Sequence, residues 1–374
     1  MSNHTAAAKV PAPQPAGRRQ TMNDPILSVQ GLIKHYEKNR SLVERLLGKP
    51  RAVVHAVNSV SLNVGRGETL GLIGESGCGK STLGRTVLRL HEPTAGMIRF
   101  DGSDITTLEP RALMRLRARM QIVFQDPYAS LNPRKTVREI VGMPLLIQGM
   151  TDAVQRDERV HTMLRRVGLR DDQFGRYPHQ FSGGQRQRIG IARALITNPE
   201  LVVCDEPVSA LDVSIKAQIL ELLSELKAEL GLTYLFISHD IAVVAHLADR
   251  IAVMYLGEIV EVGPTRELMQ QPKHPYTRAL MSAVPRVEAL GRRQRIVLKG
   301  DLPSPIAPPS GCKFHTRCPE AMPRCAVQMP TAQDINSDGT HQVACLLYDA
   351  GSRASASAQG IHVRVHTSHQ QEPS

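Results

Sequence analysis

The stretch GESGCGKST, from Gly74 to Thr82, has the residue types and spacing of a phosphate-binding loop. Its glycines let backbone N–H groups close around phosphate oxygens, and a helix that starts after it adds a favourable dipole for an anion. The pattern predicts that Lys80 contacts the β- and γ-phosphates of a nucleotide and that Ser81 ligates Mg²⁺. The loop residues expected at the nucleotide are Gly74, Ser76, Gly77, Cys78, Gly79, Lys80, Ser81 and Thr82.

Two acidic residues follow an apolar run in LVVCDEP, from Leu201 to Pro207. Ligands of open α/β sheets bind at the carboxyl ends of the strands, where Asp205 and Glu206 would emerge. Asp205 is expected to hold the Mg²⁺ shell, and Glu206 is placed to polarise a water for attack on the γ-phosphate. A strand followed by a solvated acidic turn is the alternative, and the phosphate loop in the same chain argues against it.

A second anion site is indicated by FSGGQRQRIGIARAL, from Phe181 to Leu195. Ser182 is a helix-capping residue type, and the two glycines after it let the backbone approach an anion closely. Apolar residues then recur on one face of the predicted helix, and Pro199 follows its end. The chain thus has a second helix N-terminus suited to phosphate, although one nucleotide does not need both from one subunit.

The elements that must position these residues are buried strands alternating with helices. Four apolar runs indicate strands, and helical patterns separate them, which predicts an α/β fold with a largely parallel sheet. A strand before the phosphate loop and a helix after it are the context that this motif requires, whereas an ordinary glycine turn needs neither. The predicted strands are Glu68–Gly74, Leu201–Glu206, Tyr234–His239 and Arg250–Tyr255.

Composition narrows the class of protein. The 374 residues suffice for one large domain and a smaller one, and no apolar run of about 18 residues predicts a membrane-spanning helix. The net charge of +11 suits a nucleotide, a nucleic acid or an anionic membrane face, or simply a solvated surface. Six cysteines without a secretory signal indicate a reducing compartment, where clustered cysteines bind metal or do chemistry.

Taken in order, these motifs resemble those of ABC-type ATPases, with a phosphate loop, a Ser-Gly-Gly-Gln signature before a basic helix, and an Asp-Glu strand end. The resemblance implies a P-loop nucleotide-binding domain with a helical subdomain. It also implies that two such domains pair head to tail, so that each ATP lies between the phosphate loop of one subunit and the signature of the other. The residues that would face the partner's ATP are Ser182, Gly183, Gly184 and Gln185.

The same resemblance implies roles for four further residues. Gln125 in IVFQDP matches the glutamine that senses Mg²⁺ and the membrane partner. His239 in ISHD matches the switch histidine near the γ-phosphate, and Asp212 in SALD lies in the matching D-loop. Tyr36 is the aromatic residue implied to stack on adenine.

Four stretches resemble the ATPase subunits of bacterial dipeptide and oligopeptide importers, and most nearly the F-type subunit. The resemblance implies a peripheral protein on the cytoplasmic face of the inner membrane that uses ATP to drive peptide import. Its implied partners are a second, related ATPase, two transmembrane permease subunits and an external substrate-binding protein, with no nucleic acid. The stretches are Phe124–Val137, Cys204–Leu220, His274–Pro285 and Gly300–Cys325.

Four cysteines stand near the end of the chain, with five, six and nineteen residues between them. Four thiolates are suitable ligands for Zn²⁺ or for an iron–sulfur cluster, and reduced structural thiols are a third interpretation. The spacing lacks the C-x₂-C pairs of zinc ribbons, and the resemblance to the importer subunits implies a [4Fe–4S] cluster. The cysteines are Cys312, Cys318, Cys325 and Cys345, and the additional candidates for a mixed zinc site are His315 and His341.

Composition also divides the chain. Proline becomes frequent after residue 268, so we expect an ATPase domain over residues 26–268 and a small proline- and cysteine-rich domain over 269–348. An arm over residues 1–25 and a tail over 349–374 are predicted to be disordered. Two other functions stay open, namely a soluble ABC ATPase acting on nucleic acid or the ribosome, and an importer of nickel, heme or glutathione.

Overall fold

The computed structural model describes residues 24–38, 51–284 and 296–349 of the chain. Apart from residues 24, 25 and 349, the predicted arm and tail lie outside the described residues. The strands are β1 (Leu27–Glu37), β2 (Val53–Val64), β3 (Thr69–Ile73), β4 (Ala95–Phe100), β5 (Ser103–Asp104), β6 (Met120–Val123), β7 (Leu201–Asp205), β8 (Thr233–Ile237), β9 (Arg250–Tyr255), β10 (Glu258–Pro264), β11 (Ala332–Asp334) and β12 (Gln342–Ala344). The α-helices are α2 (Lys80–Val87), α3 (Pro110–Leu116), α4 (Val137–Ile147), α5 (Ala153–Arg166), α6 (Gly183–Leu195), α7 (Val213–Leu230), α8 (Ile241–Leu247), α9 (Thr265–Gln270) and α10 (Pro275–Ser282).

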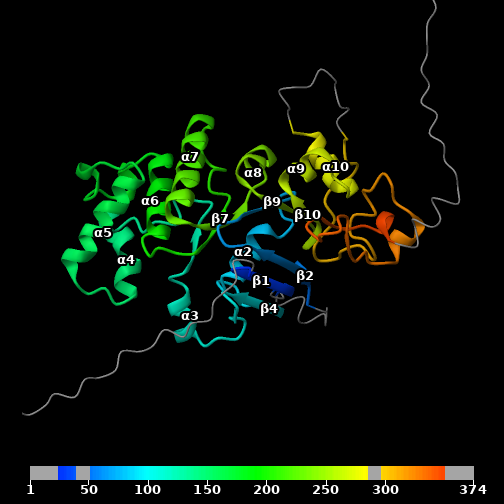
Figure 1. The fold of residues 1–374 in the computed structure, drawn as a ribbon, viewed down its shortest axis with the longest axis horizontal. Coiled ribbons are helices and arrows are strands. Elements are labelled where there is room, and N and C mark those ends of the chain that lie inside the picture. The colour runs from blue at the N-terminus through cyan, green and yellow to red at the C-terminus, as the bar shows by residue number, and fades with distance from the viewer. Residues whose placement is uncertain (1–23, 39–50, 285–295, 350–374) are drawn as a thin grey trace, which may run out of the picture.

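Two sheets form the scaffold of the described chain (Figure 1). The larger has the order β11-β12-β10-β9-β3-β8-β7-β6, and its strands from β9 to β6 are parallel. The smaller sheet, β2-β1-β4-β5, is antiparallel throughout. The predicted α/β fold is therefore confirmed, and all four predicted strands lie in the parallel part of the larger sheet.

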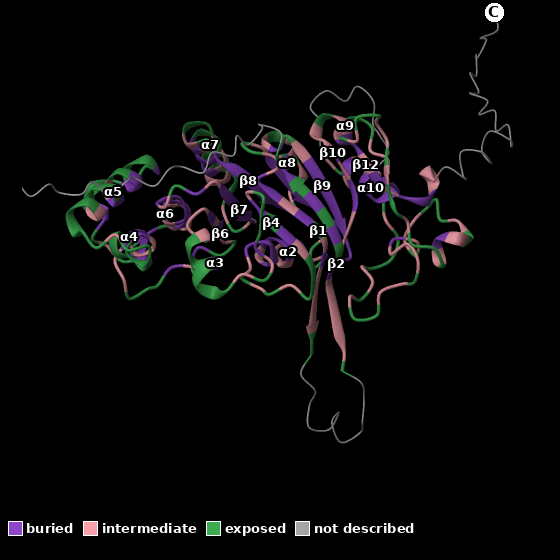
Figure 2. Cartoon of the chain, turned by 60° about the horizontal axis from the view of Figure 1, so that its bottom comes forward, coloured by how far each residue is buried: buried purple, intermediate pink, exposed green. Residues whose placement is uncertain are grey.

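The parallel strands are buried on both faces, which explains their unbroken apolar sequences (Figure 2). Every residue of β3, β7 and β8 is buried. Helices cover the sheet, and α4, α5 and α6 gather at one end of the molecule, on the side of β6 (Figure 2). This group is the predicted helical subdomain. No helix in the described parts of the chain is long and apolar enough to cross a membrane.

The signature helix α6 begins as its sequence predicts. Ser182 is the N-cap, and its hydroxyl accepts a hydrogen bond from the Gln185 N–H at 3.4 Å. The Gln185 side-chain oxygen accepts in return from the Ser182 N–H at 3.1 Å, which completes a capping box. Ile189, Ala192 and Leu195 are all buried, as the apolar face of the predicted helix requires.

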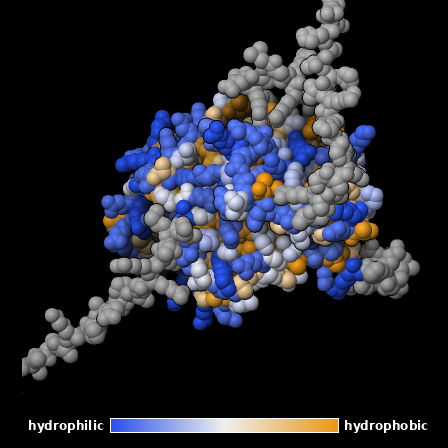
Figure 3. All heavy atoms as spheres, turned by 45° about the vertical axis from the view of Figure 1, so that its right-hand side comes forward, coloured by the Kyte–Doolittle hydropathy of each residue, from blue (hydrophilic) through white to orange (hydrophobic). Residues whose placement is uncertain are grey.

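The C-terminal region joins the main sheet. Strand β12 pairs antiparallel with β10, and β11 extends the edge beyond it. Phe314 is 1% exposed and packs against the rings of Tyr255 and Tyr276. The division of the chain at residue 268 stays a prediction, and the sheet runs across it without a break. Figure 3 shows this side of the molecule, where apolar side chains are scattered among hydrophilic ones.

Candidate nucleotide-binding site

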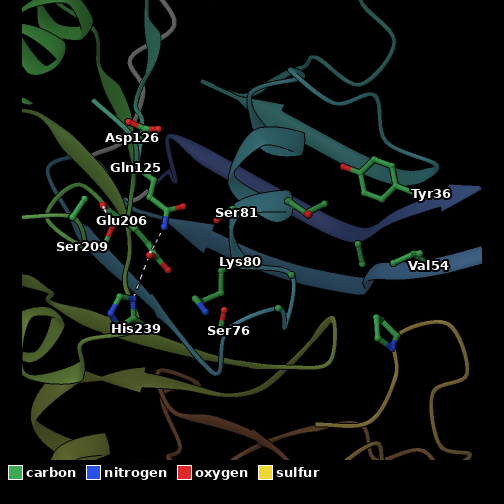
Figure 4. A pocket seen from close by; sticks show the side chains of 16 residues that line it. Tyr36, Val54, Ser76, Lys80, Ser81, Gln125, Asp126, Glu206, Ser209 and His239 are labelled. Atoms are coloured by element: carbon green, nitrogen blue, oxygen red, sulfur yellow. Dashed lines mark hydrogen bonds and ion pairs between the residues drawn. The ribbon is translucent and has the colours of Figure 1, made fainter. Parts of the chain in front are cut away.

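A cleft of 1010 Å³ lies where the predicted phosphate loop meets the carboxyl ends of β6, β7 and β8 (Figure 4). Parallel strands bring their carboxyl ends to one edge of the sheet, so residues far apart in sequence line one cleft. Tyr36 and Val54 lie at one end of the cleft, and Glu206 and His239 lie at the other. The phosphate-loop and helix residues that line it are Ser76, Gly77, Gly79, Lys80, Ser81 and Thr82.

The glycines of the loop are required by its path. Gly79 has φ +106°, and a Cβ there would lie 2.1 Å from the Ala56 carbonyl oxygen. A Cβ at Gly74 would lie 2.2 Å from the carbonyl oxygen of Met254, so neither position accepts a side chain. The thiol of Cys78 is 1% exposed, and its burial raises its pKa. Cys78 is outside the cleft lining, so its side chain is placed to fill the core behind the loop.

Lys80, which is predicted to contact the nucleotide phosphates, is buried against the phosphate loop. Only 4% of the residue is exposed, and its ammonium donates to the carbonyl oxygens of Gly74 at 2.8 Å and Glu75 at 2.9 Å. These contacts hold the side chain against the loop rather than in free solution. The ammonium group therefore lies beside the backbone N–H groups of the same loop, where both can contact a phosphate.

The two predicted Mg²⁺ ligands contact each other. The Ser81 hydroxyl donates to Asp205 Oδ1 at 2.6 Å, and Asp205 is completely buried at the end of β7. Arg85 forms an ion pair with Asp205 Oδ2 at 3.2 Å. The sequence analysis missed Arg85, although its place four residues after Ser81 puts it on the same face of α2. The Ser81 hydroxyl and the Asp205 carboxylate are the oxygen ligands that a hard metal ion prefers, whereas the Arg85 cation would compete with that ion for the carboxylate.

Glu206 is the residue on which two other motifs converge. Its Oε2 accepts from Gln125 Nε2 at 2.9 Å and lies 3.2 Å from His239 Nδ1 (Figure 4). The backbone of Glu206 is in the left-handed region with φ +48°, held by a 3.0 Å bond from its N–H to the Ile237 carbonyl. That conformation costs a non-glycine residue about 1–2 kcal/mol. It turns the chain out of the strand where the side chain faces the cleft.

The signature residues lie outside this cleft. The residues that line it do not include the signature residues Ser182, Gly183, Gly184 and Gln185. They do not include Asp212 either. Asp212 is the N-cap residue of α7, and Val213 beside it is 83% exposed. The structure therefore brings together the phosphate loop, the strand ends and Gln125 within one chain, but not the signature.

Tyr36 lines the cleft, as expected. Pro305, which was not predicted from the sequence, contacts the strand next to it. Pro305 also lines the cleft, and its carbonyl oxygen accepts from the His55 N–H at 2.9 Å. His55 lies in β2 beside Val54, so the C-terminal region reaches the Tyr36 end of the cleft. No local signal marks Pro305, because 250 residues separate it from His55 in the chain.

The four C-terminal cysteines lie near one another. Burial, together with the neighbouring thiols of Cys312 and Cys318, raises the pKa of Cys345 to about 12. Burial and the thiols of Cys312 and Cys325 act in the same way on Cys318, whose pKa is raised to about 11. The Met322 N–H donates to the Cys325 sulfur at 3.4 Å. Burial likewise raises the pKa of Cys312, so the thiols of Cys312, Cys318 and Cys345 favour the protonated form unless a cationic centre compensates them.

The expected metal site is not formed as a single-ion site. Within residues 24–38, 51–284 and 296–349, no group of three or more His, Cys, Asp or Glu side chains is arranged to hold a metal ion. The two histidines considered for a mixed zinc site have other partners. His341 Nε2 lies 2.8 Å from the Glu261 carboxylate, and His315 Nδ1 lies 2.8 Å from the Cys312 carbonyl oxygen. Both ring nitrogens of His341, with Nδ1 3.2 Å from Glu267, and Nδ1 of His315 are therefore engaged away from the thiols.

The fold and the cleft define a P-loop nucleotide-binding protein. The ABC transporter family matches residues 57–209, and the C-terminal region family of oligopeptide/dipeptide transporters matches residues 260–325. The chain is 53% identical over 326 residues to the oligopeptide transport ATP-binding protein AppF of Bacillus subtilis (strain 168), covering 86% of this chain and 97% of that protein. It therefore belongs to the ATP-binding subunits of the ABC transporter family, and is an ATPase coupled to transport.

Two further comparisons agree with this family. The dipeptide transport ATP-binding protein DppF of Escherichia coli (strain K12) is 48% identical over 329 residues, covering 88% of this chain and 96% of that protein. Among solved structures, the post-hydrolysis dimer of the ATP-binding cassette MJ0796, bound to ADP and Pi, has a TM-score of 0.56 at 30% identity. That match covers 64% of this chain and 99% of the cassette, and it confirms the predicted cassette fold.

Proposed function

We propose that this chain is the ATP-hydrolysing subunit of an importer of di- and oligopeptides, placed at the cytoplasmic face of a bacterial inner membrane. The observation that carries the proposal is the match of residues 260–325 to the C-terminal region of oligopeptide/dipeptide transporters, in a chain with a complete cleft. The names of the relatives above speak of oligopeptide and dipeptide transport. Nucleic acid, the ribosome and the other cargoes have no such support.

In the proposed mechanism Lys80 and the loop N–H groups bind the β- and γ-phosphates, and Tyr36 stacks on adenine. Ser81 and Asp205, with Gln125, would hold Mg²⁺, which when bound neutralises phosphate charge. Glu206 accepts a proton from the attacking water as the water oxygen bonds to the γ-phosphorus and the bond from that phosphorus to the bridging oxygen of ADP breaks, which releases ADP and phosphate. His239 and Gln125 keep its carboxylate in position through Oε2, as their 3.2 and 2.9 Å distances support.

The second half of each ATP site would come from another ATPase subunit. Residues Ser182 to Gln185 and Asp212 lie outside their own cleft. The N-terminus of α6, which Ser182 to Gln185 form, is suited to an anion. A head-to-tail pair would place it on the partner's ATP, and the similar cassette MJ0796 is described as dimeric. We infer that the partner is a second, related ATPase, so that the pair is a heterodimer.

Permease subunits would dock on the helical subdomain. A groove of 540 Å³ lies between α3 and α4, lined by apolar side chains that include Met143 and Ile147. Ile147 is 60% exposed and Met114 is 50% exposed, which is unusual for large apolar residues and favours a protein partner. Two such membrane subunits and an external substrate-binding protein would complete the importer, and peptide selection would lie with them.

Peptide import is tested in cells that lack this chain but retain its membrane and binding-protein partners. We expect uptake of a radiolabelled tripeptide to return when the wild-type chain is supplied, because closure of the ATPase pair powers the pore. A chain with Lys80→Ala should not restore uptake, since it removes the cation at the phosphates. Restored uptake of nickel, heme or glutathione in place of the peptide would contradict the proposed cargo.

We propose that Cys312, Cys318, Cys325 and Cys345 hold a [4Fe–4S] cluster. Backbone N–H groups donate to the sulfurs, as is usual around such clusters. The raised pKa values of Cys312, Cys318 and Cys345 call for a compensating cationic centre if these thiols are to ionise. A cluster spaces its ligands farther apart than one Zn²⁺ does. The absence of a single-ion arrangement in the described residues therefore weighs more directly against zinc. When bound, the cluster would cross-link this proline-rich region and so stabilise its fold.

Elemental analysis of protein purified without air tests this cluster. About four irons and four acid-labile sulfides per chain are expected for the wild type. Cys318→Ser should lower both, and Cys204→Ala should keep both, because Cys204 is fully buried in β7 away from these cysteines. One zinc per chain without sulfide, or no metal at all, would rule out the cluster.

A further inference from the structure

Glu75, the second residue of the phosphate loop, contacts two side chains from the C-terminal region. Its N–H donates to the hydroxyl oxygen of Tyr276 at 2.9 Å. Its carboxylate Oε2 accepts from the Arg317 guanidinium at 2.8 Å. Tyr276 and Arg317 lie 201 and 242 residues further along the chain, so only the fold brings them to this loop.

The ion pair between Glu75 and Arg317 is shielded from solvent. The Arg317 side chain is 9% exposed and that of Glu75 is 28% exposed. The guanidinium also lies over the ring of Tyr255, 5.9 Å from its centre. Charges withdrawn from water attract each other more strongly than the same pair at the surface. This ion pair therefore restricts the position of Glu75, and with it the phosphate loop.

Tyr276 is itself held rigidly. It is completely buried, and its ring packs against Tyr255 and Phe314. Its N–H donates to His274 Nδ1 at 3.1 Å, and the His274 N–H donates to the carboxylate of Glu261 in β10 at 2.9 Å. Burial lowers the pKa of His274 to about 4, so the ring is neutral and can accept this bond. The Tyr276 hydroxyl is therefore fixed to the main sheet.

Glu75 connects these contacts to Lys80, the cation that is proposed to bind phosphate. The carbonyl oxygen of Glu75 accepts from Lys80 Nζ at 2.9 Å, while its N–H and carboxylate are held by Tyr276 and Arg317. A shift of Glu75 would move both the loop backbone and the ammonium that are proposed to bind phosphate. Pro305 adds an independent contact of the same region with the cleft, near Tyr36.

We propose that the C-terminal region positions the phosphate loop of its own chain through Tyr276 and Arg317, and so sets the affinity of the site for nucleotide. The proposal rests on the nucleotide site proposed above. Arg317 and Tyr276 are positioning residues, because they act on phosphate through Glu75. Since Arg317 directly precedes Cys318, whatever orders the cysteine loop also orders this contact.

The test is the dissociation constant for ATP of the purified full-length chain, measured beside its melting temperature. Arg317→Gln is expected to weaken ATP binding roughly 5- to 30-fold, which is the lower part of the usual range of about 5- to 150-fold for coupling between linked sites. Arg317→Lys should recover part of the loss, because a cation again faces Glu75. Arg278→Gln is the matched control, since Arg278 forms a 2.7 Å ion pair with Glu320 within the same region but away from the cleft. It should leave ATP affinity unchanged.

A double-mutant comparison separates positioning from general damage. Glu75→Gln in the Arg317→Gln background should add little further loss, because both changes break one contact. Unchanged ATP affinity in Arg317→Gln, or equal losses in Arg317→Gln and Arg278→Gln, would overturn the proposal. Lys80→Ala serves as the reference for the site itself. If Lys80→Ala binds ATP normally, the nucleotide site is wrongly assigned; if it fails to bind while Arg317→Gln is normal, only the positioning role is wrong.

Discussion

Glu206→Gln is expected to slow ATP hydrolysis by the assembled transporter about a thousandfold, within the range that a general base contributes. Glutamine has nearly the same size and can still contact Gln125 and His239, but it cannot accept a proton from the attacking water. ATP affinity should stay close to that of the wild type, because the phosphate loop and Lys80 are unchanged. Steady-state hydrolysis and equilibrium ATP binding, measured on the same preparation, test both parts.

Glu92→Gln is the matched control for this change. Glu92 is likewise a glutamate with a side-chain partner, Arg89, but its side chain is 64% exposed and lies outside the cleft lining. It should hydrolyse ATP at the wild-type rate. Hydrolysis by Glu206→Gln at an undiminished rate would show that another group activates the water, and the role of Glu206 would have to be withdrawn.

Gly183→Asp is expected to lower hydrolysis by the assembled pair about a hundredfold, comparable to losing one preorganised donor at a developing charge. The change should not harm its own chain. A Cβ at Gly183 lies 3.5 Å from Leu211 and 3.9 Å from the Tyr128 hydroxyl, which are ordinary contacts. An acidic residue in the first turn of α6 is also favourable to the helix dipole. In a head-to-tail pair, however, the new carboxylate would face the partner's phosphates and repel them.

Gly183→Asn isolates the effect of charge, because asparagine has the same shape without the negative charge. It should keep much more activity than Gly183→Asp, and both variants should bind ATP normally as single chains. The neighbouring Gly184 is unsuitable for this experiment, since a Cβ there would lie 2.5 Å from Ile215. Full hydrolysis by the Gly183→Asp pair would mean that the signature does not contact ATP in the partner subunit.

The motifs that carry the site were predictable because their chemistry is local. A phosphate loop needs successive N–H groups, a lysine and a helix start within nine residues, so the stretch from Gly74 to Thr82 contains nearly all its information. The buried parallel strands were equally clear, since burial on both faces demands unbroken apolar runs. Ser182 was likewise predicted to cap its helix, and the structure confirms it as the N-cap, in a capping box with Gln185 that spans only four residues.

The long-range contacts were not predictable from one sequence. Strand β12 has three residues, Gln342 to Ala344, and its place beside β10 is decided by backbone bonds that leave no periodic pattern. Pro305 beside the cleft carries no local mark either, and the position of Arg85 after Ser81 gives its helix face but not its partner Asp205. Any of the many arginines could in principle have paired with a given carboxylate, and packing alone selects one.

The sequence by itself therefore determined the class of fold, the nucleotide chemistry and the order of the motifs, because each depends on residues that are close in the chain. Only the tertiary structure decided that Gln125 and His239 meet on one oxygen of Glu206, and that Arg317 holds Glu75. These contacts join residues 33 to 242 positions apart. Their partners are chosen by how the sheet, the helices and the C-terminal region pack, and a pattern within one segment does not contain that information.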